Sequence, residues 1–203
     1  NVLGNVTPRN YGFSDAAEAF VFLSGLSVAF AYGDRFRTGS ALEASWPLAL
    51  RAMRLYAVHI ALTISALALF GAAAFLTGQN ALLEEHGRST FFTDPLRGAL
   101  GVVILGHQIG YFNILPLYVA LLVFAPFLFA PFLFVVGRRG RWRMLLVSAT
   151  LYALARWIGF NLPSWPDPGN WFFNPLTWQL MFACGIFVGL SMQQGGLPVH
   201  NGA

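Results

Sequence analysis

The sequence predicts an all-α protein, a polytopic bundle of transmembrane helices. Of its 203 residues, 57% are hydrophobic and only 10% are charged, whereas an average soluble domain has about 25% charged residues. The apolar residues also occur in long runs, and a helix needs about 20 of them to cross the hydrocarbon core of a bilayer. A water-soluble fold cannot bury this much apolar surface, so composition and pattern both favour a membrane protein.

Five apolar runs are predicted to span the membrane. The third contains Pro126 and Pro131, which predict a kink. The fifth opens at Pro175, which suits a first helical turn because its missing N–H would have no partner within the helix. A shorter run at 96–109 holds three glycines and predicts a half-helix or re-entrant segment. The spanning runs are residues 15–33, 55–77, 113–136, 142–160 and 175–193.

The basic residues predict how the helices are oriented. They are twelve arginines, which outnumber eight acids and give a formal charge of +4. Because they lie between apolar runs, we interpret them as orientation signals and predict no nucleic-acid partner. Arginines at 35, 37, 51, 54, 138, 139, 141 and 143 occupy two connections that are therefore predicted to be cytoplasmic. The loops at 78–94 and 161–174 then face outward.

One partial membrane domain is expected at residues 1–194, followed by a Gly-rich tail at 195–203 that we expect to be disordered. The chain begins at Asn1 with neither an initiator Met nor a signal peptide, so a truncated start is expected. Cys184 is the single cysteine, which excludes an intrachain disulfide and a multi-cysteine metal site within this sequence. No metal site is predicted.

Ionisable groups inside a bilayer are costly, by about 2.5–3.5 kcal/mol each at a helix centre, so each is a functional candidate. Asp15 and Glu18 lie three residues apart at the start of the first run, on one helix face. They suit either a capping box or a substrate-facing pair. Arg54 suits an acidic ligand or membrane anchoring, and His59 suits a base or a packing residue.

Two further patterns concern the interior of the bundle. His107, Asn113 and Tyr118 belong to a polar, proline-interrupted stretch, which membranes tolerate only where it lines a cavity or is buried in protein. Ser24 and Gly25 lie in the middle of the first run, where small residues favour close helix approach.

Four ordered segments carry a family resemblance. The run NYGFSDAAEAFVFLSG at 10–25 resembles the OpgC family of membrane succinyltransferases, which modify osmoregulated periplasmic glucans. RLYAVH at 54–59, NILPLY at 113–118 and WFFNPLTWQL at 171–180 are similar to later segments of that family. The resemblance extends to about residue 190. Asn113 departs from it, because the family has Asp there, and this puts a charge-dependent role at that position in doubt.

The resemblance implies transfer of a succinyl group from succinyl-CoA to a hydroxyl of a periplasmic glucan. It implies a multi-pass protein of the bacterial inner membrane whose partners are membrane lipid, the glucan acceptor and the acyl-CoA donor, with no bound cofactor. The family's general-base histidine is expected upstream of Asn1, so this chain alone should be inactive.

The resemblance also implies roles for individual residues. The catalytic candidates are Asp15 and Glu18 on the acceptor side and His59 in the interior. Arg54 would bind the acidic donor from the cytoplasmic side. The remaining substrate-binding candidates are Tyr56, His107, Asn113, Tyr118, Asn174, Trp178 and Gln179, although an interfacial belt explains the tryptophans equally well.

Other functions stay open at this point. An acetyltransferase of the related acyltransferase-three superfamily would act on another surface polysaccharide. A transporter would use polar midplane groups for permeation, but no pair of inverted repeats is visible in the sequence. A non-enzymatic membrane assembly subunit is a further alternative.

Overall fold

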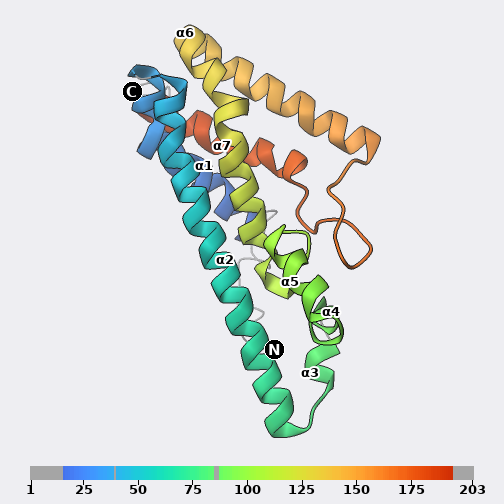
Figure 1. Ribbon diagram of the computed structural model, residues 1–203. Coiled ribbons are helices and arrows are strands. Elements are labelled where there is room, and N and C mark those ends of the chain that lie inside the picture. The colour runs from blue at the N-terminus through green and yellow to red at the C-terminus, as the bar shows by residue number, and fades with distance from the viewer. Residues whose placement is uncertain (1–15, 39, 85–86, 194–203) are drawn as a thin grey trace, which may run out of the picture. The chain divides into compact units, whose positions relative to one another are not determined.

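The computed structural model describes residues 16–38, 40–84 and 87–193 (Figure 1), so Asp15 and the predicted tail at 195–203 lie outside the described residues. The described part is all-helical, as predicted. It contains no β-strand, only an isolated bridge between Pro163 and Asn170. The helices are α1 (Ala16–Thr38), α2 (Ala41–Thr77), α3 (Ala81–Glu84), α4 (Ser89–Thr93), α5 (Pro95–Val103), the 3₁₀ helix η4 (Gly110–Asn113), α6 (Ile114–Ile158) and α7 (Pro175–Gln193).

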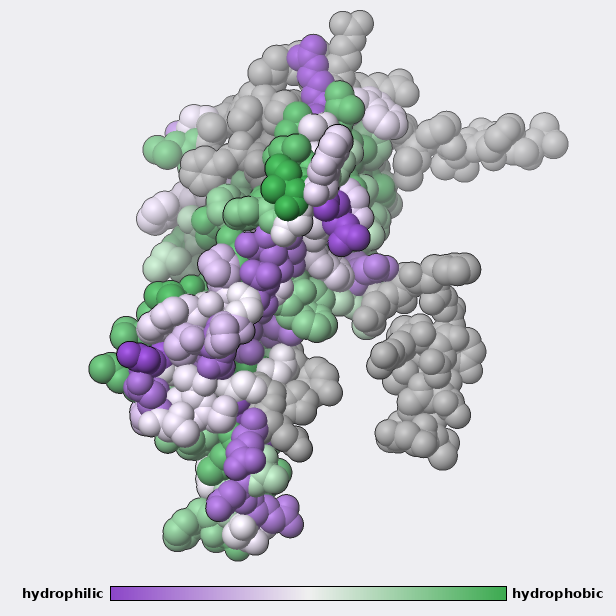
Figure 2. All heavy atoms as spheres, turned by 90° about the vertical axis from the view of Figure 1, so that its right-hand side faces the viewer, coloured by the Kyte–Doolittle hydropathy of each residue, from purple (hydrophilic) through white to green (hydrophobic). Residues whose placement is uncertain are grey.

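Within the part of the chain that the structure describes, three helices are long and apolar enough to cross a membrane. They comprise Ala16–Phe36, Leu42–Thr77 and Pro175–Gln193, and Ile114–Pro126 is a shorter apolar stretch within α6. Many large apolar side chains face outward, including Phe75 at 87% and Trp157 at 90% exposure. Figure 2 shows hydrophobic side chains, in green, beside a hydrophilic patch on the face it draws. Such exposure is costly in water and suits lipid, so this is a membrane protein.

The chain divides into two compact units. Unit 1 comprises Asn1–Leu48, Phe124–Ile158 and Leu176–Ala203, and unit 2 comprises Ala49–Val123 and Gly159–Pro175. Each unit is described by itself below. Helices α2 and α6 contribute residues to both units.

Close contact between α1 and α7 forms the centre of unit 1. A Cβ built on Gly25 would lie 2.0 Å from the carbonyl oxygen of Phe182, and one on Gly185 would lie 2.0 Å from that of Phe22. The two backbones therefore touch where only glycine fits. Gly33, two turns beyond Gly25, faces Leu190, two turns beyond Phe182, so the two helices run parallel. The prediction that Gly25 permits close helix approach is confirmed.

The second half of α6 packs against α7 in the opposite direction. The buried amide of Gln179 donates from Nε2 to the carbonyl of Ser148 at 2.7 Å. Near the C-terminal end of α7, the buried Arg141 donates from Nη1 to the carbonyl of Leu190 at 2.9 Å. The residue numbers on α6 therefore decrease as those on α7 increase, so α6 is antiparallel to α7 in this region.

The structure corrects the predicted connection at 137–141. Residues 113–136 and 142–160 do not form two helices, because α6 is one helix of 45 residues that includes the arginines at 138, 139, 141 and 143. Arginine is a good helix former, so an arginine-rich segment need not interrupt a helix. At 1.5 Å per residue the path along α6 is about 68 Å long, more than twice the hydrocarbon core, although the helix is not straight. Its ribbon changes direction between its yellow and orange parts (Figure 1).

The connection between the first two predicted spans is also shorter than expected. α1 continues to Thr38 and α2 begins at Ala41, so Arg51 and Arg54 lie in a helix and not in a loop. The backbone N–H of Glu43 donates to Ser40 Oγ at 3.3 Å, and that of Ser40 donates to Glu43 Oε2 at 3.4 Å. This reciprocal capping box starts α2 about four turns before the predicted residue 55.

Unit 2 contains the short segments. α5 has nine residues, about 14 Å of helix, which agrees with the predicted half-helix at 96–109. It begins at Pro95 after Asp94, whose side chain accepts from the Arg97 N–H at 3.2 Å. Gly78 has φ +67° and donates to the Ala74 carbonyl, so it ends α2 in the left-handed conformation that glycine favours.

Candidate functional site

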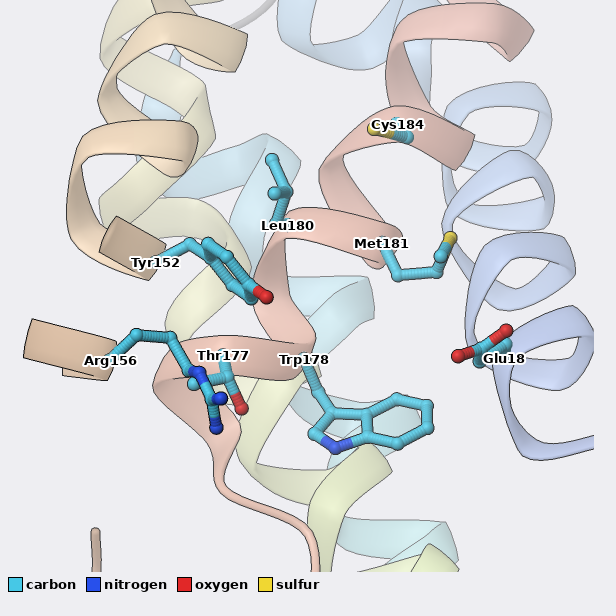
Figure 3. Close-up of a pocket in the computed structure, with 8 residues that line it drawn as sticks. All are labelled: Glu18, Tyr152, Arg156, Thr177, Trp178, Leu180, Met181 and Cys184. Atoms are coloured by element: carbon cyan, nitrogen blue, oxygen red, sulfur yellow. The ribbon is translucent and has the colours of Figure 1, made fainter. Parts of the chain in front are cut away.

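A pocket of about 380 Å³ opens among α1, α6 and α7 in unit 1 (Figure 3). We call it the three-helix pocket. Its walls combine a carboxylate, a guanidinium, two hydroxyls and an indole with apolar side chains, a mixture typical of small-molecule sites. The lining residues are Glu18 from α1, Tyr152 and Arg156 from α6, and Thr177, Trp178, Leu180, Met181 and Cys184 from α7.

The charged groups of the pocket lie on opposite sides. Figure 3 shows Tyr152 and Arg156 projecting from α6, Glu18 projecting from α1 on the far side, and Trp178 between them. Among the described residues no ion pair joins Glu18 to Arg156. The pocket therefore offers a hydrogen-bond acceptor at one side, a donor at the other, and an aromatic face between the two.

The pocket lies at one end of unit 1, away from the arginine-rich end. Glu18 is near the start of α1 and Trp178 near the start of α7, whereas Arg35 and Arg37 are near the end of α1. Trp178 and Leu190, which accepts from Arg141, are separated by about 18 Å along α7. Within unit 1 the pocket and this arginine-rich end are therefore at opposite ends of α7.

Sequence reasoning proposed Glu18 and Trp178 but missed the other polar lining residues. Tyr152 and Arg156 are four residues apart, so they lie on one face of α6. Thr177, Met181 and Cys184 are four and three residues apart, so they also lie on one face, that of α7. These helical spacings were visible in the sequence, but nothing in it showed that the faces of α6 and α7 meet.

A second polar cluster lies in unit 2 and joins segments distant in sequence. His107 Nδ1 lies 3.5 Å from Asp167 Oδ2, and the hydroxyl of Thr90 donates to the other oxygen of that carboxylate. Burial lowers the pKa of His107 below its ordinary 6.5, while Asp167 partly opposes this shift. The lowered pKa favours the neutral imidazole, and its contact with Asp167 holds two loops together.

His59 and Arg54 do not form one cluster. Five residues apart, they are about 140° apart around α2. His59 is fully buried and Arg54 is exposed. Thr63, one turn after His59, is also buried, and among the described residues neither His59 nitrogen nor the Thr63 hydroxyl has a hydrogen-bond partner. The buried polar face of α2 therefore consists of His59 and Thr63, the second of which sequence reasoning missed.

Three other candidates lie in unit 2, and two of them have partners there. The hydroxyl of Tyr56 donates to the carbonyl of Val103 at 2.7 Å, which satisfies an end group of α5. Tyr118 is buried, and its ring lies 5.6 Å from the Arg51 guanidinium carbon. Asn113 is half-buried at the end of η4.

Asn174 and Gln179 have structural partners and do not line the pocket. The Asn174 amide donates to the carbonyl of Phe160, and the two residues bracket the loop at 161–173. Gln179 is buried and donates to Ser148 in α6. Of the three predicted sugar contacts near the start of α7, only Trp178 lines the pocket.

A comparison with protein families matches residues 1–202 to the family described as "OpgC protein". The chain belongs to the OpgC family. This membership indicates a transferase with a part in modifying osmoregulated periplasmic glucans. No curated protein and no solved structure matches the chain.

Proposed function

We propose that this chain is the pocket-bearing part of an O-succinyltransferase that acts on osmoregulated periplasmic glucans in the bacterial inner membrane. The observation that carries the proposal is the three-helix pocket. It places Glu18, Arg156 and Trp178 together, at the end of unit 1 opposite the arginines at 35, 37 and 141. Membership of the OpgC family supports the glucan as acceptor.

The pocket has the chemistry that a sugar acceptor requires. An indole face packs against the C–H face of a pyranose ring, and a carboxylate accepts hydrogen bonds from ring hydroxyls. Trp178 and Glu18 supply these two groups from neighbouring helices. Leu180 and Met181 make the pocket partly apolar, which strengthens polar contacts by limiting competition from water.

The proposed reaction balances without another reactant. The oxygen of a glucan hydroxyl attacks the thioester carbonyl carbon of succinyl-CoA, a C–O bond forms, and the C–S bond breaks. The hydroxyl proton is accepted by a base and the CoA thiol is released, so the products are a succinyl ester and free CoA. Arg54, an exposed arginine on α2, is proposed to bind the anionic donor.

Variants of Glu18 and Arg54 in the complete protein test these roles. With purified glucan and succinyl-CoA, Glu18→Gln is expected to raise the KM for glucan about tenfold, whereas Arg54→Ala is expected to raise the KM for succinyl-CoA. Glu43→Gln is a matched control, because Glu43 caps α2 and does not line the pocket. Unchanged kinetics in both Glu18→Gln and Arg54→Ala would contradict the assignment.

A further inference from the structure

Arg156 is the one positive charge among the eight described residues that line the three-helix pocket. It belongs to the last turn of α6, where a cation also interacts favourably with the helix dipole. Its neighbour Tyr152 is one turn earlier on the same face, and both side chains project from α6 toward the start of α7 (Figure 3). A guanidinium and a phenol hydroxyl thus stand at the same side of the pocket.

A succinyl group differs from most acyl groups because it keeps a free carboxylate after transfer. A carboxylate is costly to place among apolar side chains such as Leu180 and Met181 unless a cation and hydrogen-bond donors meet it. A guanidinium binds a carboxylate with two parallel hydrogen bonds, which fixes both position and direction.

We propose that Arg156, assisted by the Tyr152 hydroxyl, binds the free carboxylate of the transferred acyl group and makes the protein select dicarboxylic over neutral acyl groups. This inference rests on the proposed function and adds a specificity residue to it. Glu18 on the opposite side repels an anion, so the acyl carboxylate is directed to Arg156 and the sugar hydroxyls to Glu18. Trp178 lies between them, where the sugar ring would pack.

The test compares two donors with the complete protein in phospholipid vesicles. The acceptor is unsubstituted glucan from cells that lack the gene, and the donors are succinyl-CoA and acetyl-CoA. We expect Arg156→Gln to lower kcat/KM for succinyl transfer at least tenfold and to change acetyl transfer less than twofold. Arg156→Lys keeps the charge without the paired hydrogen bonds and is expected to give an intermediate ratio.

Arg143→Gln is the matched control. Arg143 is an exposed arginine on the same helix and does not line the pocket, so the succinyl-to-acetyl ratio should be unchanged. If Arg156→Gln lost succinyl and acetyl transfer equally, Arg156 would have a purely structural role. If it lost neither, Arg156 would have no role in the transfer. Either result would overturn the inference.

Two outcomes separate this inference from the proposed function. If the wild-type protein transfers neither acyl group to glucan, the proposed function fails. If the wild-type protein prefers succinyl-CoA and Arg156→Gln keeps that preference, only the role of Arg156 fails. Should Arg156→Gln not fold, the ratio in Arg156→Lys decides, and an unchanged ratio there contradicts the inference.

Discussion

Gly25 of α1 lies directly against the backbone of Phe182 in α7, at a distance that leaves no space for a side chain. A Cβ at Gly25 would lie 2.0 Å from the Phe182 carbonyl oxygen. Backbone atoms cannot move aside as a flexible side chain can, so any substitution must push the two helices apart. Because Glu18 and Trp178 are carried by these same helices, the contact at Gly25 also sets the width of the three-helix pocket.

Gly25→Ala is therefore expected to destabilise the protein by about 3 kcal/mol or more, since overpacking of a close contact costs about 1–3 kcal/mol even where side chains can adjust. The midpoint of thermal unfolding in detergent measures this effect. Gly71→Ala is the control, because its Cβ would lie 3.4 Å from the Phe92 ring, an ordinary contact. Equal stability of the two variants would contradict the close backbone contact between α1 and α7.

The pair His107 and Asp167 predicts a pH dependence of stability. Burial lowers the pKa of His107 in the folded protein below 6.5, its value when exposed. Below pH 6.5 the unfolded chain then binds a proton that the folded chain does not, so stability falls as the pH falls. When thermal unfolding is measured between pH 8 and pH 5, the midpoint temperature should therefore fall on the acid side.

Asp167→Asn should make that drop larger, because Asp167 raises the pKa of His107 and so limits the shift. His107→Gln should remove the contribution and give a flatter profile. Asp94→Asn is a useful comparison, since Asp94 pairs with the exposed Arg97 and not with a histidine. A profile for Asp167→Asn that matches the wild type would mean that Asp167 does not act on His107.

Gln179→Leu separates packing from substrate binding. Its buried amide donates to Ser148 at 2.7 Å and does not line the pocket. Loss of this hydrogen bond should destabilise the protein by about 1 kcal/mol, with the KM for glucan unchanged. A raised KM at unchanged stability would show instead that Gln179 contacts the sugar.

Trp178→Ala tests the aromatic face of the pocket. Loss of a stacking surface that contributes about 1 kcal/mol should raise the KM for glucan about fivefold, and Trp178→Phe should keep part of the affinity. Trp157→Ala is the control, because Trp157 is 90% exposed on α6 and lies outside the pocket lining. If the two tryptophan variants behave alike, Trp178 is an interfacial residue and not a sugar contact.

Much of the fold could be predicted from the apolar runs and from the residues that mark the ends of helices. The fifth apolar run, at 175–193, has the bounds of α7, because Pro175 marks its start. The start of α2 was missed because Ser40 and Glu43 form a capping box that precedes the apolar run. The charge of the arginines at 138–143 predicts a loop, although these residues are compatible with a continuous helix.

The candidate site was only partly predictable, because tertiary packing decides which faces meet. Glu18 was proposed from its charge at a helix start, and Trp178 from the aromatic segment around it. Arg156 reaches the same pocket only because α6 packs against α7. His107 and Asp167 are sixty residues apart, and no local pattern in the sequence predicts that they meet.

The central claim is that the complete protein succinylates periplasmic glucans, and mass spectrometry of those glucans tests it most directly. Glucans are compared from cells with the gene, cells without it, and cells complemented with wild type or Glu18→Gln. We predict succinyl groups that vanish on deletion, return with the wild-type gene and return poorly with Glu18→Gln. Glucans whose succinyl content is the same with and without the gene would contradict the account.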